Sequence, residues 1–238
     1  VNSHTYRQSS RLSAALLEAD PTNRLLARGA RYRMPAWMIR DQALSASGLL
    51  VDKKGGAPVN SYQPEGIWAE ATFGKKRYSR GNGDDLYRRS IYSFWRRIAA
   101  PPMFFDNPGR ETCSVKMGLT NTPLHALSTL NDTTYVEAAR ALAGRAAALA
   151  GANSKPPAQI ERAFQLVVAR KPSKQEQEIL ENIYTRAEVR FTSDPGAAAN
   201  FLRNGESSRN SELPEPEHAA LATVCLGILN LDEALTKE

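Results

Sequence analysis

The sequence predicts an all-α fold, an irregular bundle of several helices joined by long polar loops. Ala and Leu are abundant, and no run of alternating Val, Ile and Thr of the kind typical of strands occurs. Residues that cap helices recur in front of apolar stretches. With 238 residues, 42% of them hydrophobic, the chain is long enough to bury a core as one large domain or two small ones.

Two helices are expected in the first fifty residues. The first covers Ser9–Glu18 and ends before Pro21. The second covers Pro35–Val51, with Pro35 in its first turn, where a missing N–H costs nothing. Apolar side chains leave little of the second helix's circumference polar, so we expect it to be central.

Residues 53–83, here called the aromatic loop, interrupt the helices with a stretch rich in Gly and Pro. At about thirty residues this loop exceeds an ordinary connection, and such loops tend to be functional or mobile. It carries the basic run Lys75-Lys76-Arg77 and four aromatic residues: Tyr62, Trp68, Phe73 and Tyr78. Aromatic side chains beside basic ones suit a sugar, a nucleotide or a peptide, but core aromatics with a solvated basic face fit the same pattern.

An amphipathic helix is predicted over Asp84–Ala99. At 100° per residue, five apolar side chains fall within an arc of about 100°: Tyr87, Ile91, Phe94, Trp95 and Ile98. Four arginines lie at the edge of this arc or opposite it: Arg88, Arg89, Arg96 and Arg97. Because Arg binds carboxylate and phosphate bidentately, this face is a candidate binding surface, the alternative being a solvated face.

Most of the remaining chain is predicted to be helical. The expected helices span residues 120–131, 133–149, 157–169, 173–191, 194–202 and 216–235. Asp132 is the expected cap of the second of these, and Ser173 with Glu176 forms a capping box at the fourth. A turn-rich linker over Gly151–Pro157 divides the chain into a helical core with basic and aromatic loops, residues 1–152, and a helical subdomain packed on it, residues 153–238.

The length of the apolar runs and the distribution of charge limit the classes of function that fit this chain. No stretch approaches the ~18 apolar residues of a membrane span. The first 120 residues carry 19 Lys and Arg against 10 Asp and Glu, whereas the remainder carries 12 against 15. The basic half suits a phosphate, an acidic polymer or an acidic partner domain, or it is a solvated surface. Cys113 and Cys225 lie far apart without metal-type spacing and are expected to be buried small hydrophobes.

Arg40 and Asp41 form the most informative charged pair, because they lie on the helix expected to be central. An unpaired buried charge costs several kcal/mol, so partners are expected from other segments. The candidate partners are Arg110, Glu111, Asn131 and Asp132. A buried network that ties loops to helices and a substrate site built from the same groups both fit this pattern.

The candidate site residues follow from these considerations. The candidate ligand- or partner-binding residues are Arg40, Arg88, Arg89, Arg110, Asn121 and Asn131. The candidate acid and base groups are Asp41, Glu111 and Asp132. None of the three histidines, His4, His125 and His218, has a second ligand at metal-binding spacing, so no metal site is predicted. No nucleophile elbow, P-loop or dinucleotide-binding glycine pattern occurs.

Short motifs along the whole chain follow a characteristic order. They are Thr5–Ser10, Asn23–Gly29, Met38–Asp41, Tyr62-Gln-Pro64 with Trp68, Asp85–Ser90, Arg110-Glu111, Thr120–Leu124 with Ala126-Leu127, Leu130-Asn-Asp132, Gly205-Glu-Ser207 and Leu229–Glu233. In this order the chain resembles the DUF1553 domain family, also called PSD1, of planctomycetes and related bacteria. The resemblance covers nearly the whole chain.

The resemblance implies a setting more than a reaction. It implies a large extracytoplasmic protein, periplasmic or at the cell surface, in which this domain often follows cytochrome c-type and DUF1549-type domains. Haem c is then expected in an associated domain or chain, since this chain has no Cys-x-x-Cys-His and no cofactor of its own is expected. Without an initiator Met, the chain is expected to be part of a longer polypeptide. His125 stands where the family more often has Gln, so no catalytic role is carried over to it.

Three function classes result. The first is a non-catalytic interaction or accessory domain of a redox-linked extracytoplasmic assembly, docking through an apolar or basic patch. The second is an enzyme domain acting on exported polysaccharide, which predicts carboxylates from distant segments converging in an open cleft. The third and least favoured is a polyanion or nucleic-acid binder using Lys75–Arg97, with steeply salt-dependent binding.

Overall fold

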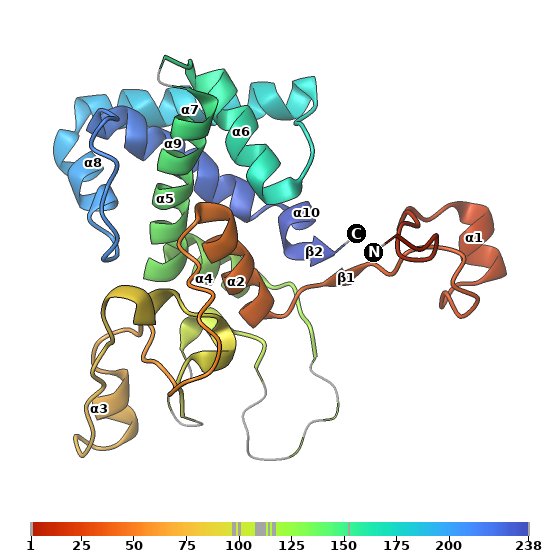
Figure 1. Cartoon of the computed structure of the whole chain (residues 1–238), viewed down its shortest axis with the longest axis horizontal. Coiled ribbons are helices and arrows are strands. Elements are labelled where there is room, and N and C mark those ends of the chain that lie inside the picture. The colour runs from red at the N-terminus through yellow and green to blue at the C-terminus, as the bar shows by residue number, and fades with distance from the viewer. Residues whose placement is uncertain are drawn as a thin grey trace.

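The computed structural model shows a helical body, residues 34–235, with an arm, residues 2–31, that stands away from it (Figure 1). The structure describes residues 2–96, 99, 101–107, 113, 115, 118–151 and 153–237. Its only sheet within these residues pairs β1 (Tyr32–Arg33) antiparallel with β2 (Thr236–Lys237) at the junction of arm and body. The predicted all-α class with long polar loops is confirmed.

Five helices form the upper part of the body in Figure 1: α5 (Thr133–Ala150), α6 (Pro156–Val168), α7 (Lys174–Ser193), α8 (Pro195–Leu202) and α9 (Glu215–Leu229). Helix α5 packs against α6 and α9, and α7 runs along α9. Fully buried alanines line α5 and α9, and their small side chains let the two backbones approach closely. One hydrophobic core includes side chains of all five helices. The division of the chain at residue 152 stays a prediction.

The lower part of the body is more irregular. It contains α2 (Ala36–Ser47), α3 (Ile67–Ala71) and α4 (Pro123–Asn131), whereas the short α10 (Asp232–Leu235) packs on α6 and α9. Helix α2 packs across α5 and ends at Gly48, whose φ of 81° closes the helix, so the helix is shorter than predicted. Trp37 on its outer face is exposed, so α2 covers the core rather than lying inside it. A second, small apolar cluster of Leu44, Tyr62, Leu86 and Tyr87 holds the aromatic loop beneath α2.

Two predicted helix caps are confirmed, and a third cap lies at the start of the helix predicted from residue 194. Asp132 Oδ1 accepts from the Thr134 N–H at 2.9 Å at the start of α5. At the start of α7, Ser173 and Glu176 form the predicted capping box. Asp194 Oδ1 accepts from the Ala197 N–H at 2.9 Å at the start of α8. These caps depend only on residues close in sequence, which explains why the sequence predicts them.

The predicted helix over Asp84–Ala99 is wrong. Two short 3-10 turns, Gly83–Tyr87 and Ser90–Tyr92, stand in its place, with extended residues between and after them. Ile91, expected on the buried face, is 82% exposed. Ile98 and Arg97 lie outside the described residues.

Tertiary hydrogen bonds replace the helical ones in this segment. The Arg40 guanidinium, reaching from α2, donates to the carbonyls of Leu86 (2.8 Å) and Arg88 (2.9 Å). The Ser90 N–H donates to Asp41 Oδ1 at 2.8 Å. The Tyr87 carbonyl accepts from the Val51 N–H at 3.0 Å. The backbone groups therefore find partners on α2 and the residues after it, and no helix is needed to satisfy them.

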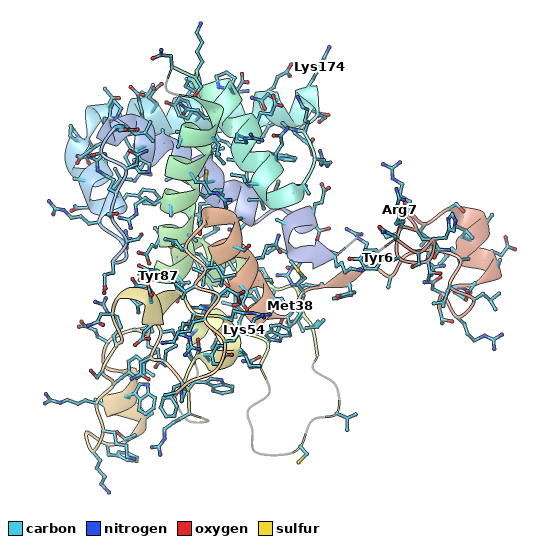
Figure 2. All side chains as sticks on the ribbon, viewed as in Figure 1. Tyr6, Arg7, Met38, Lys54, Tyr87 and Lys174 are labelled. Atoms are coloured by element: carbon cyan, nitrogen blue, oxygen red, sulfur yellow. The ribbon has the colours of Figure 1, made fainter. Side chains whose placement is uncertain are left out.

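The arm contains α1 (Ala14–Ala19), which is shorter than the predicted Ser9–Glu18 helix. Ser13 caps it by accepting from the Leu16 N–H at 3.2 Å. The Ser9 carbonyl accepts from the Gly29 N–H at 2.9 Å. Ser9 therefore pairs with the chain that returns after α1 and is not part of the helix. No residue of α1 is buried. Figure 2 shows the side chains of the arm spreading from its ribbon, with Tyr6 near the junction.

Two further findings concern membrane and cysteine predictions. Among the described residues, no helix combines the length and apolar character needed to cross a bilayer. Cys225 is buried in α9 as expected, but Cys113 is exposed, and both are free thiols. The expectation of two buried cysteines is therefore right for Cys225 and wrong for Cys113.

Candidate functional site

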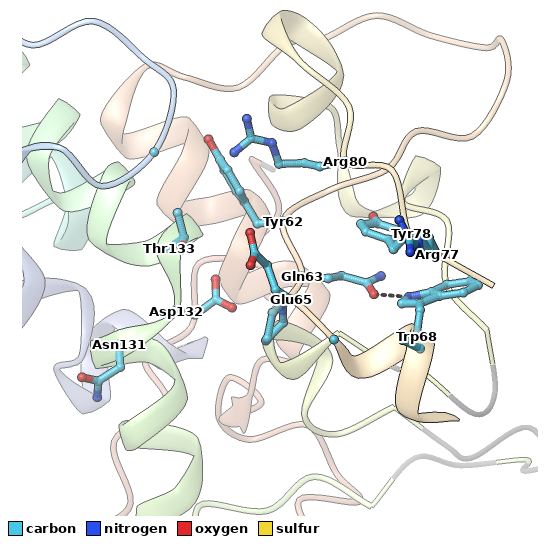
Figure 3. Close-up of a pocket in the computed structure, with 14 residues that line it drawn as sticks. Tyr62, Gln63, Glu65, Trp68, Arg77, Tyr78, Arg80, Asn131, Asp132 and Thr133 are labelled. Atoms are coloured by element: carbon cyan, nitrogen blue, oxygen red, sulfur yellow. Dashed lines mark hydrogen bonds between the residues drawn. The ribbon is translucent and has the colours of Figure 1, made fainter. Parts of the chain in front are cut away.

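A cleft of about 960 Å³ lies between the aromatic loop and the start of α5 (Figure 3). Its lining combines aromatic, basic, acidic and amide side chains: Tyr62, Gln63, Glu65, Trp68, Arg77, Tyr78, Arg80, Asn131 and Asp132. Two segments that the sequence singles out, the aromatic loop and Leu130-Asn-Asp132, thus meet at one site.

The aromatic wall of this cleft is built by rings that stack on each other. The Trp68 ring lies 5.4 Å from Tyr78 and 6.0 Å from Phe94, centroid to centroid, and Trp68 is only 6% exposed. Its indole N–H donates to Gln63 Oε1 at 2.5 Å, and the Tyr78 hydroxyl donates to the Ser61 carbonyl at 2.7 Å. Trp68 therefore shapes the wall and offers a ligand little open ring face.

A buried polar network lies beneath the cleft. Glu137, in the middle of α5, is 1% exposed. Its Oε1 accepts from the Tyr87 hydroxyl (2.8 Å) and the Ser207 N–H (2.6 Å), and the Arg140 guanidinium lies 3.4 Å away. Arg140 also donates to the Leu202 carbonyl at 2.7 Å. The network thus joins α5 to the 3-10 turn at residue 87 and to the loop after α8.

Tyr62 connects this network to the cleft. Its hydroxyl accepts from the Glu206 N–H at 2.9 Å. Burial and the neighbouring Glu137 carboxylate raise the pKa of Tyr62 well above its usual range. Burial likewise raises the pKa of Tyr87 to about 12, with the hydrogen bond to Glu137 as the next cause. Both phenols therefore stay protonated at neutral pH and remain hydrogen-bond donors.

Gly205 is required at the edge of this network. Its φ is 84°, which side chains rarely adopt, and a Cβ there would collide with the Glu137 carboxylate. The motif Gly205-Glu-Ser207 was recognised in the sequence, whereas Glu137 and Arg140 were not predicted as site residues. Two opposite charges three residues apart among the alanines of α5 are a signal that could have found them.

Two carboxylates from distant segments line the cleft, and Figure 3 shows both pointing into it. Glu65 comes from the aromatic loop and is exposed. Asp132 caps α5, and burial raises its pKa, while the hydrogen bonds from Thr134 and the charge of Arg40 oppose the rise. The Arg80 guanidinium at the rim lies 3.3 Å from Glu206 Oε2.

Arg40 and Asp41 form a network behind the cleft. The Arg40 guanidinium binds backbone carbonyls and the Ser90 hydroxyl (3.2 Å), and it lies 3.6 Å from Asp41. Burial lowers the pKa of Arg40, and the Asp41 charge opposes this shift. Asp41 also accepts from the Ser90 hydroxyl at 2.6 Å, and Arg89 Nε lies 3.7 Å away. These contacts fit a network that ties loops to α2.

Arg88 is the most buried of the three described arginines that were predicted to form a binding face, the others being Arg89 and Arg96. Its guanidinium donates to the carbonyls of Lys53 (3.0 Å), Gly55 (2.5 Å) and Ala57 (3.0 Å) and lies over the Tyr92 ring at 3.9 Å. It thereby fixes the start of the aromatic loop. Both terminal nitrogens of Arg88 donate internally and its side chain is buried, so it does not form an exposed arginine face with its neighbours.

The other predicted site residues are scattered. Asn131 lines the cleft, and its side-chain amide donates to the Leu127 carbonyl at 2.8 Å. Asn121 is exposed in front of α4. Arg110 and Glu111 lie outside the described residues. Of the expected partners of Arg40, Asp132 acts on it through its charge.

His125 lies in a packed environment, whereas His4 lies at the surface. His125 is buried and stacks on Phe105 with 4.3 Å between ring centroids. Its Nε2 lies 3.5 Å from Asp106 Oδ1, and its Nδ1 lies 3.2 Å from the Thr120 carbonyl. His4 is exposed in the arm. In the part of the chain that the structure describes, no three His, Cys, Asp or Glu residues are arranged to hold a metal ion.

The arm offers a second candidate surface. Four leucines are exposed on it: Leu12, Leu17, Leu25 and Leu26. Polar contacts hold the arm together, because the buried Asp20 carboxylate accepts from the Arg24 (2.8 Å) and Leu25 (2.7 Å) N–H groups. Five arginines against two carboxylates give residues 2–31 a charge of +3. The arm thus combines exposed apolar side chains with a basic surface.

Comparison with known proteins identifies a family. The model of the PSD1 family, described as "Protein of unknown function (DUF1553)", matches residues 1–184. The match includes the arm, the aromatic loop and α5. No curated protein and no solved structure matches the chain significantly.

Proposed function

The chain belongs to the PSD1 (DUF1553) family of unknown function, and we propose that it is a non-catalytic interaction domain of a larger assembly. The observation that carries this proposal is the arm, whose helix α1 buries no residue although five of its six residues are Ala or Leu. Leu25 and Leu26 beside it are 70% and 59% exposed. The arm therefore presents an apolar surface that the described part of the chain leaves exposed.

The chemistry of the arm indicates its partner. Covering a leucine side chain contributes up to about 2 kcal/mol, so a partner that covers several of them gains useful affinity. The charge of +3 favours a partner whose rim is acidic around an apolar centre. We expect a protein surface of this kind in another domain or chain of the same assembly.

The resemblance to DUF1553 proteins supports the finer part of the proposal. On that basis the assembly is extracytoplasmic, periplasmic or at the cell surface, and redox-linked. Its other members are cytochrome c-type and DUF1549-type domains or chains, which would hold haem c. This chain would contribute docking and no cofactor.

The test is binding of the intact chain to separately produced DUF1549-type and cytochrome c-type domains from the same source protein, by calorimetry. The double variant Leu17→Asp with Leu25→Asp should weaken binding more than tenfold, because it puts charge into the apolar contact. Ile91→Asp on the body is the matched control, since Ile91 is also an exposed apolar residue. Equal affinity of the arm variant and the parent chain refutes docking through the arm.

One observation favours a second function, an enzyme acting on polysaccharide at the cleft. Asp132 and Glu65 come from distant segments and both line the open cleft. A carboxyl group with a raised pKa suits a general acid, and an exposed carboxylate suits a base. Asp41, the other described acid/base candidate, lies in the Arg40 network instead.

Release of reducing sugar ends from exported polysaccharides tests this second function. Asp132→Asn removes the acid but keeps a good helix cap, so it should abolish turnover without unfolding α5. Asp194→Asn makes the same change at the cap of α8, which is not among the residues that line the cleft, and should leave turnover intact. Turnover that survives in Asp132→Asn excludes this role.

A further inference from the structure

A second, smaller cavity of about 260 Å³ lies between α5, the first turn of α9 and the loop that joins α8 to α9. Four basic side chains line it: Arg140, Arg145, Arg209 and His218. Ser208 and Asn210 complete its polar lining, and no carboxylate is among the lining residues. We propose that this basic cavity binds a tetrahedral oxyanion, phosphate or sulfate, either free or as the terminal group of an ester.

The deepest lining residues leave polar atoms without partners. His218 is 1% exposed, and its Nε2 lies 3.0 Å from the Arg140 carbonyl, so the ring donates there. His218 Nδ1 and Arg140 Nε are buried and have no hydrogen-bond partner within the described structure. An unpartnered buried polar atom is unfavourable. The oxygens of phosphate or sulfate can accept from a donor such as Arg140 Nε, and the hydroxyl of hydrogen phosphate can in addition donate to an acceptor such as His218 Nδ1.

The two outer arginines are held in place and keep free donors. Arg145 Nη1 donates to the carbonyls of Ser45 (3.0 Å) and Ala46 (2.8 Å) at the end of α2. Arg209 Nη1 donates to the Leu213 carbonyl at 2.8 Å. In each case one nitrogen is anchored to the backbone, and the guanidinium is pre-organised for an oxyanion.

The balance of charge around the cavity is positive. Arg140 is paired with Glu137 at 3.4 Å, and Arg209 lies 3.8 Å from Glu215. Arg145 has no ion pair with any carboxylate among the described residues. One cationic group at the cavity is therefore uncompensated, which favours an anion over a neutral ligand.

Gly144 supports the idea of a built cavity. Glycine in the middle of a helix costs roughly 1 kcal/mol relative to alanine. A Cβ at this position would lie 3.3 Å from Asn210 Cβ, tighter than an ordinary contact. The glycine therefore lets the loop after α8 approach α5 and close the cavity.

Calorimetric titration of the intact chain with sodium phosphate and, separately, sodium sulfate at constant ionic strength tests the proposal. Arg145→Gln should weaken saturable binding by about tenfold or more, because it removes a charge-assisted contact. Arg203→Gln is the matched control, an exposed arginine of the same loop that does not line the cavity. Arg209→Gln tests the opposite rim if loss of the Arg145 contacts to α2 prevents folding.

A third titration with a phosphate monoester distinguishes a free ion from an ester group. Binding of the monoester shows that the cavity admits a substituted oxyanion, and binding of the free ion alone restricts the proposal to inorganic phosphate or sulfate. Absence of saturable binding by all three ligands overturns the proposal. So does binding that is unchanged in both cavity variants.

Discussion

Helices α1 and α5 are both rich in Ala and Leu, yet one buries nothing and the other buries twelve residues. The difference lies in what faces them. Helix α5 has α6 and α9 packed on it, whereas within the described residues no element packs closely enough on α1 to bury any of its side chains. Helical propensity is local, but the stabilisation that an apolar face contributes depends on a neighbouring surface. The contrast separates a body that has its own apolar core from an arm whose apolar side chains stay exposed.

The two regions also differ in what holds them together. The body depends on one large apolar core and on a buried charge network around Glu137. The arm is held by hydrogen bonds from backbone N–H groups to the Asp20 carboxylate. At its junction with the body, Arg31 pairs with Asp232 at 2.5 Å. Segments with few buried contacts open at low free energy. We therefore expect changes in the body to alter global stability and equivalent changes in the arm to alter only local order or binding.

The largest effect on global stability is expected from Glu137→Ala. This variant leaves the buried Arg140 guanidinium without its carboxylate, which costs about 3–5 kcal/mol. Denaturant unfolding measures the loss. Glu178→Ala, an exposed position on α7, is the control and should change stability by less than about 0.5 kcal/mol. A small effect of Glu137→Ala contradicts a stabilising role for the network.

The same substitution in the two helices tests the comparison directly. Leu142 of α5 is fully buried, so Leu142→Ala should cost about 2–4 kcal/mol through lost burial and a cavity. Leu17 of α1 is exposed, and Leu17→Ala should be close to neutral in denaturant unfolding. A loss at Leu17 that approaches that at Leu142 means that α1 packs on the body in solution.

Removal of a serine cap should lower global stability in the body but not in the arm, with a smaller effect than the leucine substitutions. Ser173→Ala removes half of the capping box of α7 and should lower global stability by about 1 kcal/mol. Ser13→Ala removes the cap of α1 and should leave the global midpoint unchanged. Hydrogen exchange of the arm amides should rise in Ser13→Ala alone. Equal shifts of the midpoint in both variants contradict independent opening of the arm.

The smallest effect is expected from acid titration. Arg170 and the Ser173 N–H lower the pKa of Glu176 from 4.5 to about 2. A depressed carboxyl pKa contributes stability above pH 4.5 that is lost as the pH falls toward 2. Because this pair is largely exposed, the contribution is small. Glu176→Gln should flatten the stability profile between pH 4.5 and 2, and an unchanged profile contradicts the contribution.

Local chemistry explains which parts of the fold the sequence predicts correctly. The predicted caps Asp132 and Ser173 act within three residues of themselves, so a short window of sequence specifies them. The order of short motifs likewise predicts the family, which the match over residues 1–184 confirms. Asn131 and Asp132, chosen as candidate site residues, lie at the cleft because they occupy the junction of α4 and α5.

The helix predicted over Asp84–Ala99 does not form, because the apolar periodicity of a segment does not show which other segments bind its backbone. Arg40 and Asp41 of α2 bind the backbone there, and this competition is invisible in the segment itself. The Glu137 network was missed for a related reason. Its partners Tyr62, Tyr87 and Ser207 come from three separate segments that approach one another only in the folded chain.

The sequence by itself determined the helical class, the helix caps and the family of this protein, since each depends on residue type and short-range spacing. Tertiary structure decided which charges are buried, which carboxylates share a cleft and which arginines surround the basic cavity. It also decided that the leucines of α1 stay exposed while those of α5 do not. The physical reason is that a side chain becomes buried only when distant segments pack together, and a buried polar group must then find its partner among those segments.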